Sequence, residues 1–456
     1  MDKNKKRSTF SGKLGFVLSA AGASVGLGNI WRFPYLAAKY GGGIFLLVYI
    51  ILALTFGYTM IMAESSLGRM TRKSPVGAFE HFGKSKGFAV GGWINAIIPI
   101  LIVPYYSVIG GWVIKYLVGY IGGQSKNLAS DDYFSSFISN GLSTEICFLI
   151  FTLATLGIIY AGVRNGIERV SKFMMPILIV LSLIIAVYSV TRPGAIEGVK
   201  YFLVPNFDHF SWMTVVSAMG QMFYSLSIAM GILITFGSYM KKDTSIEKST
   251  ENVEIFDTAI AIMAGLMIIP AVFAFSGGNA ETLKSGPALM FITIPKVFAN
   301  MGFGTAIGIV FFLLVLFAAV TSSIALTESA VSTFEDELHW SRKKSTVFMG
   351  MVMLLLGTLS CLGYGPLANF KILGMQFLDF FDFITNSVMM PIAAIATCLL
   401  VSKVVGVDKI EEEITKDGQA FRRKKIFCFM IKYLCPLFAA IILISSVANA
   451  FGIITM

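Results

Sequence analysis

Residues 21–29 read Ala21-Gly22-Ala23-Ser24-Val25-Gly26-Leu27-Gly28-Asn29, in the middle of an otherwise apolar stretch. Three glycines and two hydrogen-bonding side chains therefore stand where a membrane-spanning helix would have to be continuous. Helix can be broken inside a bilayer only where the freed backbone groups line a cavity within the protein. The alternative is that these glycines serve only the close packing of neighbouring helices.

A second run of the same character is Gln221-Met222-Phe223-Tyr224-Ser225-Leu226-Ser227-Ile228-Ala229-Met230-Gly231, five apolar stretches further along the chain. Paired interruptions at corresponding positions of two halves are typical of secondary transporters built from inverted repeats, where they mark the binding site. The pairing favours a site over packing alone. The first run also resembles a dinucleotide-binding glycine motif, but no strand precedes it, so that interpretation is rejected.

The composition places both runs in a membrane protein. Of the 456 residues, 56% are hydrophobic and only 14% are charged, whereas soluble domains carry about a quarter charged residues. The net charge of +10 lies in short segments between apolar stretches and not in a basic domain, which argues against nucleic-acid binding. The five cysteines form no CxxC pair, and the three histidines lie far apart. This pattern does not predict a disulfide framework or a metal cluster, and it gives no indication of an enzyme.

Eleven stretches are long enough to cross a bilayer, which takes about 20 mostly apolar residues. They are residues 14–38, 44–63, 88–123, 146–163, 173–190, 212–239, 255–276, 307–333, 347–362, 377–401 and 426–455. The third exceeds the length of one crossing, so we expect it to be strongly tilted. We predict an all-α polytopic membrane protein in which residues 1–456 form a single transmembrane domain.

The distribution of basic residues predicts the orientation. Segments that share a side with the N-terminus carry most of the Lys and Arg, in runs such as Arg342-Lys343-Lys344 and Arg422-Arg423-Lys424-Lys425. Basic segments stay in the cytoplasm. We therefore expect residues 1–13 to form a cytoplasmic tail, the C-terminus to be extracellular, and the chain to lie in the cell membrane.

Ionisable residues inside the predicted spans are costly and mark functional sites by default. They are Arg32, Glu64, Asp257, Glu328, Asp379 and Asp382. Glu64 and Asp257 lie at the ends of their predicted spans, so a position at the membrane interface is the alternative for these two. The eighth span adds a run of hydroxyl groups, Thr321-Ser322-Ser323.

At these residues the chain resembles the neurotransmitter:sodium symporter family, in particular its bacterial amino-acid transporters with eleven spans. The run Val25-Gly26-Leu27-Gly28-Asn29-Ile30-Trp31-Arg32-Phe33-Pro34-Tyr35 is similar to the family signature, and Gly41-Gly42-Gly43, the second glycine-containing run and Thr321-Ser322-Ser323-Ile324-Ala325 follow in matching order. The resemblance implies five helices over 14–190, an inverted copy over 212–401 with the first and sixth helices broken, and an extra helix over 426–455.

The resemblance implies two sodium sites. The first maps to the Ser24 carbonyl, Asn29, Ser225 and Asp257, an acid where the family often has asparagine. The second maps to the carbonyls of Gly22, Val25 and Ala318 and the hydroxyls of Thr321 and Ser322. Oxygen ligands of this kind suit hard cations.

The resemblance also implies a small-molecule substrate, an L-amino acid, between the two broken helices. The predicted contacts are Ala23, Ser24, Gly26, Gly28, Ile102, Tyr106, Tyr224, Ser225, Ser227, Met230, Ser322 and Leu326. No mapped position of the side-chain pocket is acidic or basic, so a hydrophobic or aromatic amino acid fits best. Methionine in the lining would accommodate several side-chain sizes.

Further roles carried over by the resemblance concern gating. Arg32 with Asp382 would form the outer gate, and Arg7 with Asp336 the inner gate beside Phe10 and Tyr239, whereas Glu64 would hold the broken segments through their backbone amides.

The leading hypothesis is a sodium-coupled amino-acid symporter that works by alternating access. We expect it not to require chloride, because the Asp257 carboxylate supplies the negative charge; a proton taken up there after sodium leaves would give proton antiport. The alternative is a sensor or channel-like protein of the same fold that binds an amino acid without coupled transport.

Overall fold

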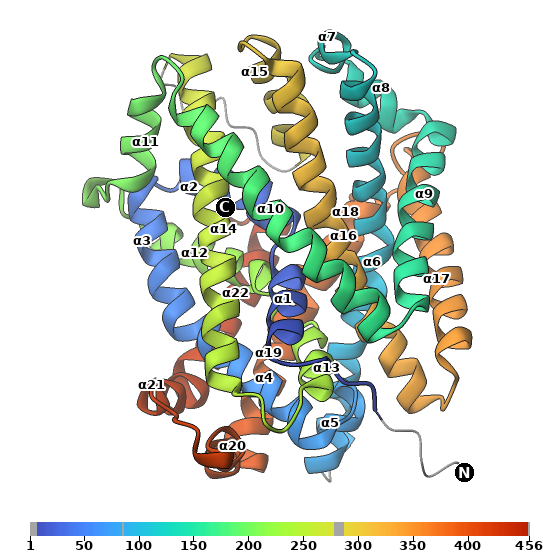
Figure 1. The fold of residues 1–456 in the computed structure, drawn as a ribbon, viewed down its shortest axis with the longest axis vertical. Coiled ribbons are helices and arrows are strands. Elements are labelled where there is room, and N and C mark those ends of the chain that lie inside the picture. Colours follow the sequence, from blue (N-terminus) through green and yellow to red (C-terminus); the bar gives the residue numbers. More distant parts are fainter. Residues whose placement is uncertain (1–6, 84–85, 278–286, 455–456) are drawn as a thin grey trace.

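The computed structural model describes residues 7–83, 86–277 and 287–454, and this part of the chain consists of helices and their connections without a strand. The helices form one bundle, most of them running roughly along its long axis (Figure 1). Nine helices of the described residues are long and apolar enough to cross a membrane, or ten with a bent pair counted as one span. The predicted all-helical fold is confirmed.

The order of elements gives the frame for the site; η marks short π-helical or 3-10 segments. The first half contains α1 (Lys13–Ser24), η1 (Gly28–Arg32), α2 (Phe33–Lys39), α3 (Gly43–Leu52), η2 (Ala53–Gly57), α4 (Tyr58–Thr71), α5 (Pro75–Phe82), α6 (Lys86–Ile121), α7 (Ser125–Leu128), α8 (Tyr133–Ser139), α9 (Gly141–Tyr160), η3 (Val163–Glu168), α10 (Arg169–Val190) and α11 (Ala195–Leu203). Figure 1 shows α7, α8 and α11 at one end of the bundle and α5 at the other.

The second half contains η4 (Phe207–His209), α12 (Trp212–Ser225), α13 (Ile232–Tyr239), α14 (Ile246–Ser276), η6 (Leu289–Thr293), α15 (Ile294–Ala299), α16 (Gly304–Glu337), α17 (Arg342–Leu362), α18 (Phe377–Asp382), η7 (Phe383–Met389), α19 (Met390–Leu399), η8 (Leu400–Val405), α20 (Val407–Ile414), η9 (Lys416–Gly418), α21 (Lys424–Phe429), η10 (Met430–Leu434) and α22 (Cys435–Ala450). Helices α20 and α21 lie at the same end as α5 (Figure 1).

The first predicted span is broken where the glycines predicted it. Helix α1 ends at Ser24, Val25 is extended (φ −75°, ψ 93°), and helical structure resumes at Leu27 with an angle of 53° between the two halves. The break therefore leaves the backbone of Val25 and Gly26 outside any helix.

The sixth predicted span is also broken. Helix α12 ends at Ser225 and α13 begins at Ile232, and three residues between them, Ser227, Ala229 and Gly231, have positive φ angles of 53°, 59° and 69°. Only Gly231 adopts this backbone without strain, since a Cβ is disfavoured there. Neither α12 nor α13 is long enough to count as a span, which is why the count stays below the predicted eleven.

The structure shows the environment of two acidic residues, Asp257 and Glu64, whose position the sequence left open. Helix α14 begins at Ile246, well before the predicted start of that span, so Asp257 lies inside the helix and is fully buried. Glu64, in α4, is also fully buried. Both acids are thus enclosed by the bundle and are not exposed on its surface.

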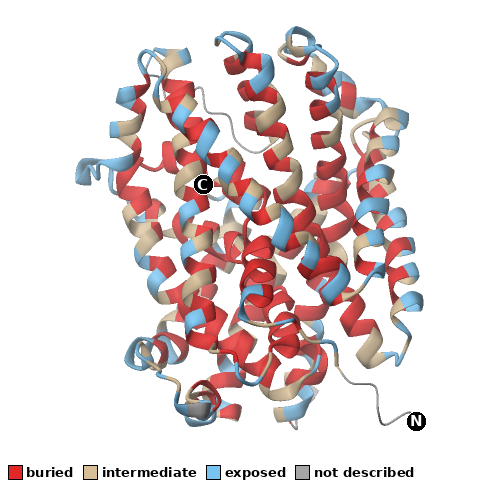
Figure 2. Ribbon diagram, in the orientation of Figure 1, coloured by how far each residue is buried: buried red, intermediate tan, exposed pale blue. Residues whose placement is uncertain are grey.

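The core surrounds the two breaks. Figure 2 shows buried residues concentrated in the middle of the bundle and exposed residues on its outer helices. The exposed apolar side chains, such as Leu153, Leu183 and Leu355, lie on α9, α10 and α17. In a membrane these faces meet lipid, which accounts for a charged fraction too low for a soluble surface.

A buried ion pair joins the connection before the last span to the bundle. Arg69 of α4 donates from Nε to Glu413 Oε1 of α20 at 2.6 Å and from Nη1 to the Thr244 carbonyl at 2.6 Å. Nη2 donates to the Glu413 carbonyl. The two side chains are 1% and 5% exposed, so the pair is almost fully desolvated.

Substitution of Arg69 tests this contact. Arg69→Ala leaves the Glu413 carboxylate buried with only Lys416 as its partner, so the free energy of unfolding should fall by about 3 kcal/mol. The double variant Arg69→Ala/Glu413→Ala should recover part of this loss. Apparent melting temperatures in detergent measure both, and equal melting of Arg69→Ala and the parent would contradict the role of the pair.

Candidate functional site

A small cavity of about 30 Å³ lies between the two breaks. It is lined by Ala23, Ser24, Gly26, Leu27, Gly28, Asn29, Ile102, Tyr106, Tyr224, Ser227, Met230, Ser322 and Leu326. The structure thus brings together all of the residues expected to contact substrate except Ser225. Leu27 and Asn29 join the lining although they were not among those contacts.

Part of the cavity lining is polar, and it leaves no room for a side chain at Gly26 or Gly28. The Leu27 amide donates to the Tyr106 hydroxyl at 3.3 Å. A Cβ at Gly26 would lie 2.7 Å from Ser322 Oγ, and one at Gly28 would overlap the Tyr224 ring. Backbone amides at the start of a helical segment, together with a hydroxyl, form an arrangement that binds carboxylates.

The rest of the lining consists largely of apolar side chains. Its side chains include Ala23, Ile102, Met230 and Leu326. Among the described residues no acidic or basic side chain lines it. A ligand held here would therefore combine a carboxylate with an uncharged side chain.

Carbonyl oxygens of the first break converge on helix α16. Ser322 Oγ lies 3.4, 3.1 and 3.4 Å from the carbonyl oxygens of Gly22, Ala23 and Val25. One hydroxyl has a single hydrogen to donate, so it cannot satisfy all three acceptors.

Thr321, next to Ser322 on the same helix, contributes a second hydroxyl. Thr321 Oγ1 lies 3.0 and 3.1 Å from the carbonyl oxygens of Phe317 and Ala318, one turn earlier. The predicted members of the second sodium site are thus gathered with a surplus of oxygen acceptors, which suits a hard cation. In the described part of the chain no cluster of His, Cys, Asp or Glu could hold a metal, so backbone and hydroxyl oxygens supply this set.

Asp257 stands at the centre of a second polar cluster. Its carboxylate accepts from Asn29 Nδ2 at 2.8 Å, from Ser225 Oγ at 2.9 Å and from the Tyr49 hydroxyl at 2.9 Å. Asn29 also donates to Ser225 Oγ at 2.9 Å. Three predicted members of the first sodium site therefore meet, with Ser24 on the wall of the adjacent cavity. Tyr49 was missed, since nothing in its aliphatic sequence context distinguishes it.

Two side chains connect the breaks to the rest of the bundle. The Ala229 amide donates to Glu64 Oε1 at 2.8 Å, and the other Glu64 oxygen is buried without a hydrogen-bond partner in the described structure. Gln221 Nε2 donates to the Gly28 carbonyl at 3.0 Å and so joins the second broken helix to the first. The predicted role of Glu64 thus has support at one backbone amide of the second break.

A larger cavity of about 460 Å³ lies beside the small one, and Arg32, Tyr224 and Asp382 line it. Tyr224 lines both cavities, so its ring forms part of the partition between them. The Arg32 guanidinium lies 5.4 Å from the centre of that ring.

Arg32 and Asp382, the predicted outer gate, do not form an ion pair in this structure. Asp382 instead accepts from the Tyr105 hydroxyl at 3.1 Å and from Asn386 Nδ2 at 2.5 Å. Arg32 and Asp382 share the cavity wall, and the Arg32 side chain faces the aromatic ring of Tyr224.

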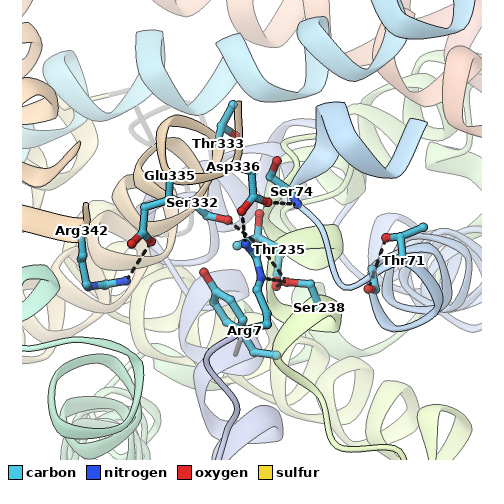
Figure 3. A network of polar contacts seen from close by, with 12 residues as sticks. Arg7, Thr71, Ser74, Thr235, Ser238, Ser332, Thr333, Glu335, Asp336 and Arg342 are labelled. Atoms are coloured by element: carbon cyan, nitrogen blue, oxygen red, sulfur yellow. Dashed lines mark hydrogen bonds and ion pairs between the residues drawn. The ribbon is translucent and has the colours of Figure 1, made fainter. Parts of the chain in front are cut away.

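The predicted inner pair forms directly, as Figure 3 shows. Arg7 Nη1 lies 2.6 Å from Asp336 Oδ1, and Arg7 also donates to Ser238 Oγ and Ser332 Oγ at 2.9 and 2.8 Å. Asp336 Oδ2 accepts from the Ser74 amide at 2.6 Å. Four separate segments are held together here.

Aromatic side chains pack around Arg7 at the same end of the bundle. The Arg7 guanidinium lies 4.9 Å from the centre of the Tyr239 ring, and Phe10 packs edge-on against Phe16, Phe236 and Tyr239. Burial by itself would lower the pKa of Arg7, but Tyr239 and the Asp336 carboxylate raise it, so the guanidinium stays charged. Polar and aromatic contacts thus join the N-terminal segment to α13 and α16 at this end of the bundle.

Comparison with known proteins relates the chain to one family of transporters. The model of the sodium:neurotransmitter symporter family matches residues 7–129 and 129–453. The chain is 33% identical over 454 residues to the sodium-dependent transporter YhdH of Bacillus subtilis, covering 99% of both chains. It is 26% identical to the human sodium- and chloride-dependent GABA transporter 2, covering 95% of this chain and 79% of that protein.

A solved structure is similar throughout. The crystal structure of MhsT in complex with L-phenylalanine superposes with a TM-score of 0.87 at 35% identity, covering 97% of this chain and all of that one. Both the sequence and the fold are therefore shared with sodium-dependent transporters along almost the whole chain.

Proposed function

The chain belongs to the sodium:neurotransmitter symporter family, a family of multi-pass membrane transporters, and we propose that it couples sodium to the uptake of a hydrophobic or aromatic L-amino acid. The observation that carries the proposal is the small cavity between two broken helices, with amides and a tyrosine hydroxyl on part of its lining and largely apolar side chains on the rest. The matching structure of MhsT holds L-phenylalanine, a ligand of this kind.

The substrate would lie with its carboxylate at the amides of Gly26 and Gly28 and the Tyr106 hydroxyl. Its ammonium group would meet carbonyl oxygens of the two breaks, and its side chain would lie toward Ile102, Met230 and Leu326. A second charge on the side chain would have no partner there, and burying an unpaired charge is costly. This favours uncharged side chains.

Sodium would occupy two sites. One is the set of carbonyls and hydroxyls around Ser322, and the other is the cluster of Asn29, Ser225 and Asp257. Because backbone from the first break contributes to both an ion site and the substrate cavity, each ligand would help to hold the backbone in the conformation that the other needs. That sharing is the physical basis of coupling.

Alternating access would use the asymmetry of the two ends. The larger cavity adjoins the site on one side, while the contacts of Arg7 and Asp336 close the other. We place the N-terminus in the cytoplasm, so the closed end is the inner gate, and we count α12 with α13 as one broken span to reach eleven. Residues 14–190 and 212–401 would be the two inverted repeats.

Chloride would not be required. Relatives named as chloride-dependent GABA transporters are only 25–26% identical to this chain. Here the buried Asp257 carboxylate, held by Asn29, Ser225 and Tyr49, would supply a negative charge beside the first sodium site. Protonation of the same group after sodium leaves would allow the empty carrier to return with a proton.

Binding of ligands tests the proposed substrate class. L-phenylalanine and L-leucine should raise the apparent melting temperature of the purified protein in sodium chloride but not in choline chloride. The reason is that the first break contributes backbone to both the ion sites and the substrate cavity. L-glutamate and L-lysine should not. Stabilisation by the charged amino acids but not by the apolar ones would contradict the proposal.

Substitution in α16 tests the second sodium site. Thr321→Ala with Ser322→Ala removes both side-chain oxygens, so the sodium concentration for half-maximal stabilisation by L-phenylalanine should rise about tenfold. The matched control is Thr327→Ala with Thr333→Ala, which removes two buried hydroxyls of the same helix that are not members of the predicted site. An unchanged sodium dependence in the first variant would place the site elsewhere.

Replacement of chloride tests the role of Asp257. Uptake by the parent at fixed sodium concentration should be unchanged when gluconate replaces chloride. Uptake by the Asp257→Asn variant should require chloride or should no longer depend on pH. The control is Asp408→Asn, which removes an exposed acid of α20. Strong inhibition of the parent by gluconate would refute chloride independence.

A further inference from the structure

The last span carries positive charge on its outer face. Helices α21, η10 and α22 together form the span Lys424–Ala450, which is the least buried of the nine long spans in the described residues. Lys425 and Lys432 are exposed on it, and neither forms an ion pair within the described part of the chain. Both lysines lie toward the end of the span near α20.

These two lysines share a face of the span. They stand seven residues apart, which is two helical turns or about 10 Å. Phe429 and Tyr433, between and beside them, are 55% and 63% exposed, and their rings lie 5.8 Å apart. Met430 and Ile431 are buried and mark the opposite, inward face.

The depth of Lys432 makes its charge significant. It lies eight residues into the span, about 12 Å along the axis. A charge at this depth is costly unless the long side chain reaches back toward the polar headgroups. Reaching back directs the Lys432 ammonium toward Lys425, so two cations meet at one place on the membrane surface.

The face continues toward the other membrane surface as an apolar strip. Leu437 and Ile444 are exposed on α22, beyond Tyr433. Two lysine ammonium groups toward one end of the span, followed by exposed aromatic and then aliphatic side chains, match the order of an anionic phospholipid: headgroup first, acyl chains after it.

We propose that Lys425, Phe429, Lys432, Tyr433, Leu437 and Ile444 form a binding surface for one anionic phospholipid. The lysines bind the phosphate and its uncompensated negative charge, and the apolar strip binds the acyl chains. Charge complementarity supports this occupant over a second copy of the chain, since a symmetric contact through this face would bring four lysines together.

Two of the three neighbouring basic residues are paired within the protein, whereas Arg422 is exposed like Lys425 and Lys432. Arg423 lies 3.2 Å from Glu254, and Lys424 lies 2.6 Å from Glu411, so both are used within the protein. Lys425 and Lys432 are left for an external anion. None of the six residues lines either cavity of the transport site, and the proposal does not depend on the proposed substrate.

Native mass spectrometry of the full chain with added phosphatidylglycerol or phosphatidylcholine tests the proposal. The parent should retain phosphatidylglycerol in preference to phosphatidylcholine. Lys425→Gln with Lys432→Gln should weaken phosphatidylglycerol binding about tenfold or more, because each basic residue near the surface contributes several-fold. Lys425→Arg with Lys432→Arg should retain binding.

The matched control is Lys126→Gln with Lys371→Gln, two exposed lysines outside this surface. Melting temperatures without added lipid report whether each variant is folded. Equal retention of the two lipids by the parent, or unchanged phosphatidylglycerol binding in the folded Gln variant, would overturn the proposal. Loss of a dimer instead of a lipid adduct would identify a second copy as the occupant and would overturn it as well.

Discussion

Backbone groups freed by a broken helix must find partners, and inside a membrane water is not freely available to supply them. This constraint organises the molecule. The carbonyls of Gly22, Ala23 and Val25 lie within hydrogen-bond distance of the Ser322 hydroxyl of α16. The Gly28 carbonyl accepts from Gln221, and the Ala229 amide donates to Glu64. Each break is thus stabilised by side chains from other spans, and what they leave unsatisfied is available to ligands.

The breaks also explain how ions and substrate can depend on one another. The same short backbone segment around Ser24–Gly28 faces the small cavity, the hydroxyls of α16 and the Asp257 cluster. A cation that orders these carbonyls prepares the amides on their other side for a carboxylate. Three hydrogen-bond donors hold the buried Asp257 carboxylate in its orientation beside this segment.

Much of this arrangement could be predicted from the sequence, since acidic and hydroxyl side chains beside glycines are costly inside an apolar span unless they line a site. The breaks at Gly26 and after Ser225, the lining of the small cavity and the inner contact of Arg7 with Asp336 lie where the chain indicated. Tyr49 and the deep position of Asp257 could not be predicted, because they depend on where α14 begins and on which face of α3 turns inward. The separation of Arg32 from Asp382 depends on the conformation of the bundle, which no local pattern encodes.

If the two broken helices bind sodium and an amino acid together, as we propose, then the sodium gradient drives the uptake of the amino acid. The decisive experiment is the accumulation of labelled L-phenylalanine in proteoliposomes under an inward sodium gradient. The predicted result is transient accumulation above the external concentration, abolished when sodium is equal on both sides or replaced by choline. Binding without accumulation, or uptake indifferent to the sodium gradient, would contradict the claim and would point to a sensor or channel-like protein of the same fold.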